Sequence, residues 1–421
     1  MGLTLAFCQR VWDKWEWGWG KFKKHYHYDI RVLFLFSIFT AMKTLSLFIL
    51  FAFPFLVCGQ NPLLEKQIDS IVNKHIADDK MPGLSIGIVK NNEVLFIKGY
   101  GTKTIHENNP IDSISNFLTA SVSKLFTATA IMQLCEQGKI DLNKKLVDYV
   151  PEFEMKDKRY KDITVYQLLT HTSGLPNFFN PNFIKPENDN VALTTFARKL
   201  KTKKLSYPPG VSLTSHTYSN TGYNMLGLII ERVSGQTFSD YMDEHILKPV
   251  GMNYSSFFYD RIDEKRRTTP HKKNWLTGKV KASNYYPDIP QDKPCGNLNS
   301  CSVDLCKWIL HNLSIHKATT NIGVIKHETL ETMWTTKEEI EGYTTSIGLG
   351  WWIVQSKKYS KYLFHVGNDP GYSASLTLSP DNDFGIVVLC NGMYPMQEVW
   401  NAIPFEIIDL FKDDWRMQVE K

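Results

Sequence analysis

The chain has 421 residues, of which 43% are apolar and 13% are aromatic, so it can bury a large core. Its formal net charge is +5, but residues 1–59 hold seven Lys/Arg and three Asp/Glu, which leaves 41 of the 48 basic and 40 of the 43 acidic side chains in the remainder. A balance this even excludes a strongly basic surface, and we expect no nucleic-acid partner.

The cysteine spacing gives no sign of a metal site. No CxxC pair is followed by a second such pair, so zinc is not predicted, and we expect neither a metal nor an organic cofactor. A single disulfide within the cluster Cys295, Cys301 and Cys306 would need an oxidising compartment, and we favour buried free thiols. The seven cysteines are Cys8, Cys58, Cys135, Cys295, Cys301, Cys306 and Cys390.

Residues 42–59 have the pattern of a secretory signal peptide. Lys43 supplies the charged start, an apolar run of 13 residues follows from Leu45 to Val57, and small residues precede Gln60. We therefore expect cleavage after Gly59 and an exported protein, either periplasmic or secreted.

The stretch 1–41 has no globular pattern, and we interpret it as an over-extended gene start, with translation from Met42. Two alternatives stay open. If the chain starts at Met1, the apolar residues after Arg31 would form a membrane anchor. Cys58 would allow lipid attachment, although Val57 stands where a small residue is expected. The oligomeric state is left open.

Hydrophobic periodicity predicts the first elements of the mature chain. Apolar residues recur at helical spacing over 62–75, which predicts an amphipathic helix. Alternation over 84–88, the turn Asn91-Asn92 and the run 94–97 predict a β-hairpin. A buried helix is expected from Ser121 to Cys135.

Further along, helical patterns dominate from Val165 to about Met252, with one helix over 223–233. Strands at both ends of the chain with helices between them favour one antiparallel sheet built from both termini. We place the α/β part at about 60–130 and 300–421, and the mainly helical part at about 131–299. The last predicted elements are strands over 347–354, 362–366, 372–378 and 384–389, then a helix over 398–411.

Ser121 and Lys124 are the first candidates for catalysis. Positions i and i+3 share one face of a helix, so the lysine would lie beside the serine oxygen. A serine needs a neighbouring base to become a nucleophile, and a helix N-terminus favours developing negative charge. The spacing alone is weak evidence, because Ser314 and Lys317 repeat it, and we interpret that second pair as accidental.

Two further motifs distinguish the pairs. Tyr218-Ser219-Asn220 is the only Tyr-x-Asn in the chain, and His365-Val366-Gly367 is the only His-x-Gly. Both follow Ser121 in the order that penicillin-recognising serine enzymes use, whereas Ser314 comes after Tyr218 and breaks that order.

With these motifs the chain resembles the class C β-lactamase and D-alanyl-D-alanine carboxypeptidase family, along nearly all of 62–410. Supporting stretches are Leu168–Pro176, Tyr207–Gly210 and Leu247–Met252. The resemblance implies a serine β-lactamase-like α/β sandwich, in which terminal helices flank an antiparallel sheet and a mainly helical domain is inserted. The catalytic site would lie at their junction.

The resemblance also implies roles for single residues. Ser121 would be the nucleophile, Lys124 its hydrogen-bonded partner, Tyr218 the general base and Asn220 a donor to the substrate. The oxyanion hole would consist of the backbone N–H groups of Ser121 and Asn368, worth several kcal/mol in such enzymes.

Purely structural interpretations remain for each residue. Ser121 and Lys124 would then mark a helix start with a solvated lysine, Tyr218 would be a core aromatic, and Asn220 a turn or helix-start residue. His171 is interpreted as a residue that packs a loop rather than as a catalytic one.

His365 departs from the family pattern, which has lysine at this position. Histidine titrates near pH 6.5, so the third motif (His365, Gly367 and the following Asn368) would bind a substrate carboxylate weakly. We therefore expect an exported serine hydrolase of amides or esters acting on a small molecule or peptide. The alternative is a cell-envelope protein that binds peptides or β-lactams with little turnover.

Overall fold

The computed structural model describes residues 62–177, 189–214, 216–274, 276–318, 323–340 and 343–412. The predicted leader at 42–59 and the stretch before it lie outside these residues. Within the described ranges, no helix combines the length and apolar character needed to cross a membrane.

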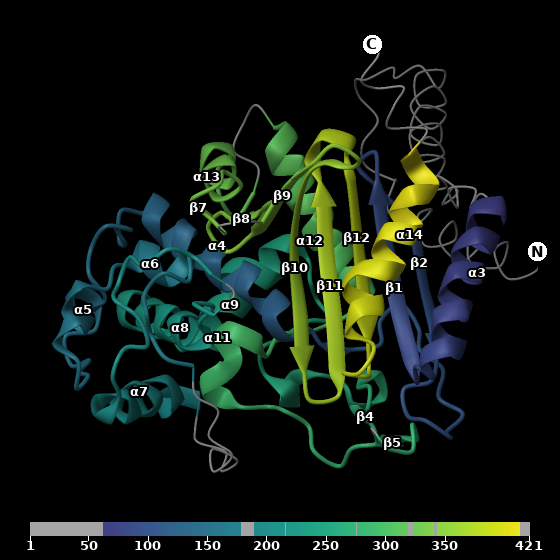
Figure 1. Cartoon of the computed structure of the whole chain (residues 1–421), viewed down its shortest axis with the longest axis horizontal. Helices are drawn as coiled ribbons and strands as arrows, with labels where there is room; N and C mark the ends of the chain where they lie inside the picture. Colours follow the sequence, from purple (N-terminus) through teal and green to yellow (C-terminus); the bar gives the residue numbers. More distant parts are fainter. Residues whose placement is uncertain are drawn as a thin grey trace, which may run out of the picture. The chain divides into compact units, whose positions relative to one another are not determined.

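One antiparallel sheet of eight strands organises the described chain (Figure 1). Its strand order is β2-β1-β12-β11-β10-β9-β8-β7, so strands from the two ends of the chain meet at β1 and β12. The strands are β1 (Gly83–Lys90), β2 (Glu93–Gly101), β7 (Glu338–Glu339), β8 (Thr345–Ile347), β9 (Trp352–Ser356), β10 (Ser360–Asp369), β11 (Tyr372–Ser379) and β12 (Phe384–Cys390).

The hairpin of β1 and β2 forms where the sequence predicts it. Asn91 and Asn92 have φ values of 53° and 62°, and two left-handed residues in a tight turn match the right-handed twist of the paired strands. All eight residues of β1 are buried, because both faces of the strand are covered.

Helices α3 (Pro62–Asp79) and α14 (Ile403–Ile408) cover one face of the sheet. Ile68 of α3 and Ile407 of α14 pack with Ile86 in a core of fully or nearly fully buried side chains. The first and the last helix of the described chain therefore stabilise the same layer (Figure 1).

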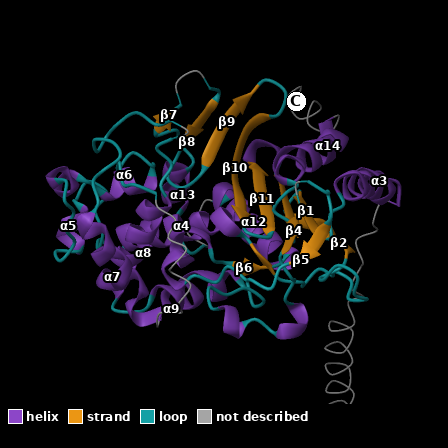
Figure 2. Ribbon diagram, turned by 60° about the horizontal axis from the view of Figure 1, so that its bottom comes forward, coloured by secondary structure: helices purple, strands orange, loops and turns teal. Residues whose placement is uncertain are grey.

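The opposite face packs against α12 (Ser302–Lys317) and the helical part of the chain (Figure 2). A Cβ on Gly87 would lie 2.4 Å from Cys306 Sγ, so only glycine lets α12 approach β1 this closely. The remaining helices are α4 (Ser123–Glu136), α5 (Leu146–Tyr149), α6 (Val165–Leu169), α7 (Asp189–Lys199), α8 (Asn220–Ser234), α9 (Phe238–Met242), α10 (Lys248–Val250), α11 (Lys293–Gly296) and α13 (His327–Met333).

The predicted fold class, an antiparallel sheet flanked by terminal helices with an inserted helical part, is confirmed. Outside the main sheet, the described chain also contains two short β pairs that the periodicity does not reveal. They are β3 (Phe117–Leu118) with β6 (Asn299–Ser300), and β4 (His271–Lys273) with β5 (Val280–Ala282).

Two predicted elements are wrong in detail. The single strand expected over 347–354 is interrupted by a tight connection between β8 and β9, in which Gly350 has a φ of 87° and a Cβ on Gly348 would lie 2.0 Å from the Met333 carbonyl oxygen. The helix expected over 398–411 is irregular: a wide turn over Glu398–Ala402 precedes α14, since Pro404 lacks the N–H that a regular helix interior needs.

Candidate active site

The structure brings Ser121 and Lys124 together as their spacing predicts. Ser121 lies in a 3₁₀ turn, Ala120–Val122, that leads directly into the buried helix α4. Lys124 Nζ donates a hydrogen bond to Ser121 Oγ at 3.0 Å. Ala120 has a φ of 47°, a left-handed conformation that is costly for alanine and that turns the chain immediately before the serine.

All three hydrogens of the Lys124 ammonium have acceptors. Besides Ser121 Oγ, Nζ donates to Asn220 Oδ1 at 2.8 Å and to the carbonyl oxygen of Cys295 at 2.6 Å. The side chain is fully buried. Three acceptors around Nζ fit the charged form of lysine, which has three donors and no lone pair.

Tyr218 lies beside this ammonium. Lys124 Nζ is 5.0 Å from the centroid of the Tyr218 ring, within range of a cation–π contact. The ring also contacts the ring of His171, with centroids 4.3 Å apart and the planes tilted by 34°. His171 is buried and its Nδ1 accepts a hydrogen bond from the backbone N–H of Ser219 at 3.1 Å, so it packs and orients the tyrosine motif.

Asn220 begins α8 and carries its side chain to Lys124. Its backbone N–H donates to Asn177 Oδ1 at 2.7 Å, and Asn177 Nδ2 donates to the carbonyl oxygen of Tyr218. Ser219 caps the helix by accepting a hydrogen bond from the Gly222 N–H. The tyrosine motif is thus fixed at a helix start and by a neighbouring loop.

Strand β10 brings the third motif against the nucleophile. A Cβ on Gly367 would lie 2.2 Å from the Thr119 carbonyl oxygen and 3.0 Å from the Ser121 nitrogen, so the two backbones are in direct contact. Pairing of β9 with β10 ends at Phe364, and beyond it this edge of β10 has no partner among the strands of the described residues.

Trp400, which no sequence motif indicated, orients this part of β10. Its Nε1 donates to the carbonyl oxygen of Gly367 at 3.1 Å, and the turn that carries it packs on β11 and β12. Because a trans peptide is planar, the N–H of Asn368 points the opposite way from that carbonyl, toward the unpaired edge. This is the direction that the predicted oxyanion hole requires.

His365 is buried, with 1% of its surface exposed. Burial, together with the nearby charge of Lys124, lowers the pKa of His365 to about 3, so the ring is neutral at every working pH. The expectation that it titrates near pH 6.5 is therefore wrong, because no opposite charge among the described residues offsets the cost of burying the cation.

Two carboxyl groups near Lys124 also escaped the sequence analysis. Burial and the proximity of Asp292 raise the pKa of Asp369 to about 7. Burial likewise raises the pKa of Asp292, whose Oδ1 accepts a hydrogen bond from Asn224 Nδ2 at 2.8 Å. One feature of the sequence could have indicated Asp369: it lies two residues after Gly367, and residues spaced by two in a strand belong to the same face of that strand.

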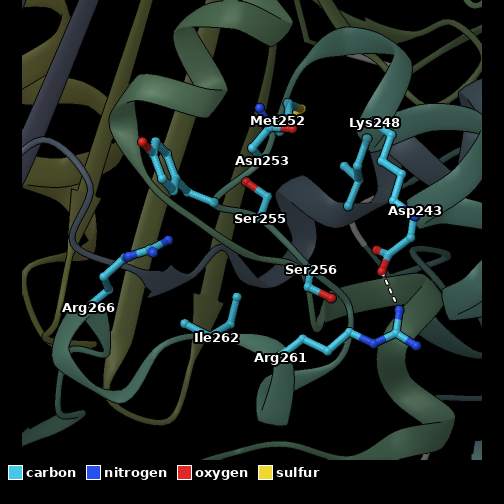
Figure 3. Close-up of a pocket in the computed structure, with 11 residues that line it drawn as sticks. Asp243, Lys248, Met252, Asn253, Ser255, Ser256, Arg261, Ile262 and Arg266 are labelled. Carbon is cyan, nitrogen blue, oxygen red and sulfur yellow. Dashed lines mark hydrogen bonds and ion pairs between the residues drawn. The ribbon is translucent and has the colours of Figure 1, made fainter.

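The second serine–lysine pair does not form a site. Ser314 Oγ bonds to Asn92 Oδ1 at 3.1 Å, and Lys317 forms an ion pair with Asp383. A separate pocket is lined by Lys248, Arg261 and the Asp243 carboxylate that pairs with Arg261 (Figure 3). It contains none of the predicted catalytic and substrate-binding residues.

The cysteines and acidic groups of the described ranges form no metal cluster of three or more ligands. Cys135, Cys295, Cys301, Cys306 and Cys390 are free thiols in the structure, so the cluster near residue 300 contains no disulfide.

Comparison with known proteins identifies the family of the chain. Residues 68–405 match the model of the beta-lactamase family, and the chain belongs to that family of serine-hydrolase folds. Among curated relatives, the protein flp of Staphylococcus aureus (strain MW2) is 29% identical over 328 residues, covering 78% of this chain and 63% of flp. Penicillin-binding protein 4* of Bacillus subtilis (strain 168) is 27% identical, covering 71% of this chain and 66% of that protein. The chain thus spans less than two thirds of the length of flp.

Solved structures show the same fold. An octameric penicillin-binding protein homologue from Pyrococcus abyssi has a TM-score of 0.68 at 26% identity, covering 82% of this chain and 76% of its own. A class C beta-lactamase has a TM-score of 0.68 at 20% identity, covering 82% of this chain and 96% of its own.

Proposed function

We propose that the protein is an exported serine hydrolase that cleaves an amide or ester bond of a small molecule or peptide through an acyl-enzyme on Ser121. The observation that carries the proposal is the 3.0 Å hydrogen bond between Lys124 Nζ and Ser121 Oγ, made beside Tyr218. Export rests on the signal-peptide pattern of residues 42–59 alone.

In the first half of the reaction, Ser121 Oγ attacks the carbonyl carbon and its proton passes to ionised Tyr218. Lys124, whose three hydrogens are already engaged, stays charged and stabilises the tyrosinate. The backbone N–H groups of Ser121 and Asn368 hold the oxyanion. As the carbon–heteroatom bond breaks, the proton on Tyr218 moves to the leaving amine or alcohol.

In the second half, a water molecule attacks the acyl carbon and gives a proton to Tyr218. The ester bond to Ser121 then breaks, the acid leaves, and Ser121 Oγ recovers the proton. The buried, neutral His365 supplies no cation for a substrate carboxylate, so efficient hydrolysis of penicillins is not part of this proposal.

The test is labelling with a fluorophosphonate followed by peptide mapping and hydrolysis of a neutral chromogenic ester. Label on Ser121, absent from Ser121→Ala and unchanged in the matched Ser314→Ala variant, supports the proposal, as does ester turnover that needs Ser121. Labelling that persists in Ser121→Ala contradicts it. Stable acylation without turnover would instead favour the alternative function, a cell-envelope binding protein.

A further inference from the structure

Strands β4 and β5 form a two-stranded hairpin whose one face is fixed to the body of the protein (Figure 2). His271 of β4 is fully buried, and its Nε2 accepts a hydrogen bond from the backbone N–H of Ile105 at 3.0 Å. Its Nδ1 therefore carries the hydrogen and donates to the carbonyl oxygen of Asn391 at 2.9 Å. Because side chains alternate between the faces of a strand, the next residue, Lys272, points away from the body and is exposed.

The outer face of this hairpin carries three lysines. Lys272 lies directly opposite Lys281 across the two strands, and Lys279 is two residues from Lys281 on the same face. All three are exposed and line one surface cavity. Lys80, directly after α3, adds a fourth cation, because its Nζ is 4.0 Å from the position that a Cβ on Gly278 would take. We call Lys80, Lys272, Lys279 and Lys281 the basic face.

The positive charge of the basic face is not balanced within the protein. Residues 268–287 contain no acidic residue, so the even balance of the whole chain conceals a local excess. None of the four lysines has an ion-pair partner among the described residues. Like charges directly opposite each other destabilise a sheet, and the Lys272–Lys281 pair has this cost with no internal contact to offset it. The basic face thus fits an anionic partner outside the chain.

Lys273, on the inner face of the same hairpin, shows the contrast. Its Nζ lies over the ring of Tyr394, 5.1 Å from the centroid. It is also close enough to Asp79 for its charge to lower the pKa of that carboxyl group. The lysine that points inward therefore has partners, and those that point outward do not.

An apolar side chain projects from the tip of the hairpin. Leu276 has 73% of its surface exposed. Its backbone is held in place, because Asn274 Oδ1 accepts hydrogen bonds from the N–H groups of Leu276 at 3.0 Å and Thr277 at 2.8 Å. Lysines beside an exposed apolar side chain are typical of a segment at a membrane interface, where the lysines reach the headgroups and the apolar group enters the acyl boundary. A polyanion in water would bind the lysines but gain nothing from the leucine.

We propose that the basic face and Leu276 dock the protein on an anionic phospholipid bilayer. This surface is separate from the Ser121 site, so the inference goes beyond the proposed function and does not depend on it. The two are joined through β10: the backbone N–H of His271 donates to the carbonyl oxygen of Gly371 at 3.4 Å, just beyond the end of β10 that carries Asn368 (Figure 1). Docking would therefore bring that end of β10 toward the lipid surface.

The test is cosedimentation with vesicles of phosphatidylcholine, with or without phosphatidylglycerol. The apolar run 45–57 would bind lipid by itself, so the protein is used in its predicted exported form, residues 60–421. This form contains all eight strands of the sheet and the cores on both of its faces. We expect at least about tenfold tighter binding to vesicles with phosphatidylglycerol at about 0.1 M salt, and loss of most of this preference at about 0.5 M salt.

Two triple variants locate the binding surface. Changing Lys272, Lys279 and Lys281 together to Gln should weaken binding to the anionic vesicles at least about 20-fold, since each lysine near such a surface contributes about fivefold. A control with the same change of net charge, made at exposed lysines elsewhere, should lose no more than about threefold. The control positions are Lys156, Lys158 and Lys161. Leu276→Asn should weaken binding about fivefold through loss of the apolar contact.

Equal binding to both kinds of vesicle, or an equal loss in the two triple variants, would overturn the inference. Tighter binding to soluble polyphosphate than to anionic vesicles, unaffected by Leu276→Asn, would also overturn it, because the partner would then be a polyanion in water. Circular dichroism checks that each variant is folded. Ester hydrolysis in solution should be unchanged in the lysine variants, so a failure of the proposed function is seen separately.

Discussion

Lys124 Nζ has three hydrogen-bond partners within 3.0 Å, and one of them is the Oγ atom of the nucleophile. A serine hydroxyl both donates and accepts, so this contact alone does not name the base. The family resemblance gives that role to Tyr218, whose ring lies beside Nζ.

We therefore expect Tyr218→Phe to lower the acylation rate by at least about 100-fold, the scale of general-base loss. Stopped-flow acylation with a chromogenic ester measures the step directly, and circular dichroism checks the fold. A variant that keeps most of its acylation rate would move the base function to Lys124.

The neutral state of His365 has a consequence for the pH profile. With a pKa of about 3, the ring of His365 does not change charge between pH 5.5 and 8. The titratable groups near it are Lys124, which lowers this pKa further, and His171, whose own pKa is lowered by burial. The profiles of kcat/KM against pH for wild type and His365→Gln should have the same shape. A wild-type limb near pH 6.5 that vanishes in the variant would show that the histidine does become charged.

Asp369 should reduce the stability of the folded protein as the pH rises. Its folded pKa, about 7, lies above its ordinary value of 3.8, so the folded state binds the proton more tightly than the unfolded state. The contribution of Asp369 to the free energy of unfolding is fully present below pH 3.8 and is lost as the pH rises through about 7.

Asp369→Asn removes this titration. Relative to wild type, the free energy of unfolding of the variant should therefore increase between pH 4 and pH 8 by about 2 kcal/mol, after discounting for partial exposure. Urea unfolding at the two pH values measures it. If the difference in unfolding free energy between wild type and Asp369→Asn were the same at both pH values, the pKa of Asp369 would not be raised in the folded protein.

At the scale of elements, the contact of β10 with the turn Ala120–Val122 fixes the distance between the two backbone N–H groups of the predicted oxyanion hole, those of Ser121 and Asn368. Gly367→Ala would bring Cβ to 2.2 Å from the Thr119 carbonyl oxygen, and a backbone atom cannot rotate away. We expect ester hydrolysis to fall by at least about 100-fold, comparable to loss of an oxyanion-hole donor. In the matched Gly222→Ala, the new Cβ has no neighbour closer than 3.5 Å, and activity should be retained. Near-normal activity of Gly367→Ala would argue against this contact.

Trp400 acts on the same strand from the other side. Trp400→Phe keeps the ring but removes the hydrogen bond to the Gly367 carbonyl, so the Asn368 N–H loses part of its fixed orientation. We expect kcat to fall about tenfold with little change in KM, because the hole binds the transition state more than the substrate. Asn401→Ala, an exposed neighbour, serves as the control. If Trp400→Phe lowered the melting temperature but left kcat unchanged, Trp400 would contribute to packing and not to the orientation of the oxyanion hole.

For the whole molecule, local patterns in the sequence predict the elements better than the environment of the site. The hairpin at Asn91 and the helix after Ser121 follow from turn chemistry and periodicity, and motif order separates Ser121 from Ser314. Burial of His365 was beyond prediction, because it depends on how the turn Ala120–Val122 packs against β10 in the folded chain. The proximity of Asp292 and Asp369 likewise arises only in the folded chain, since 77 positions separate them and no motif links them.

The sheet topology also has a consequence for the time course of synthesis. Leu84 pairs with Cys390, so the inner edge of the first hairpin has no partner until the last strand, β12, has been made. At 5–20 residues per second, translation of the roughly 300 residues between them takes about 15–60 s. During that interval an apolar strand edge is open to pairing with other chains. The yield of correctly folded protein should therefore depend on the rate of translation. When synthesis is slow or ribosomes are crowded, a larger fraction of these chains should aggregate than of chains whose paired strands are also neighbours in sequence.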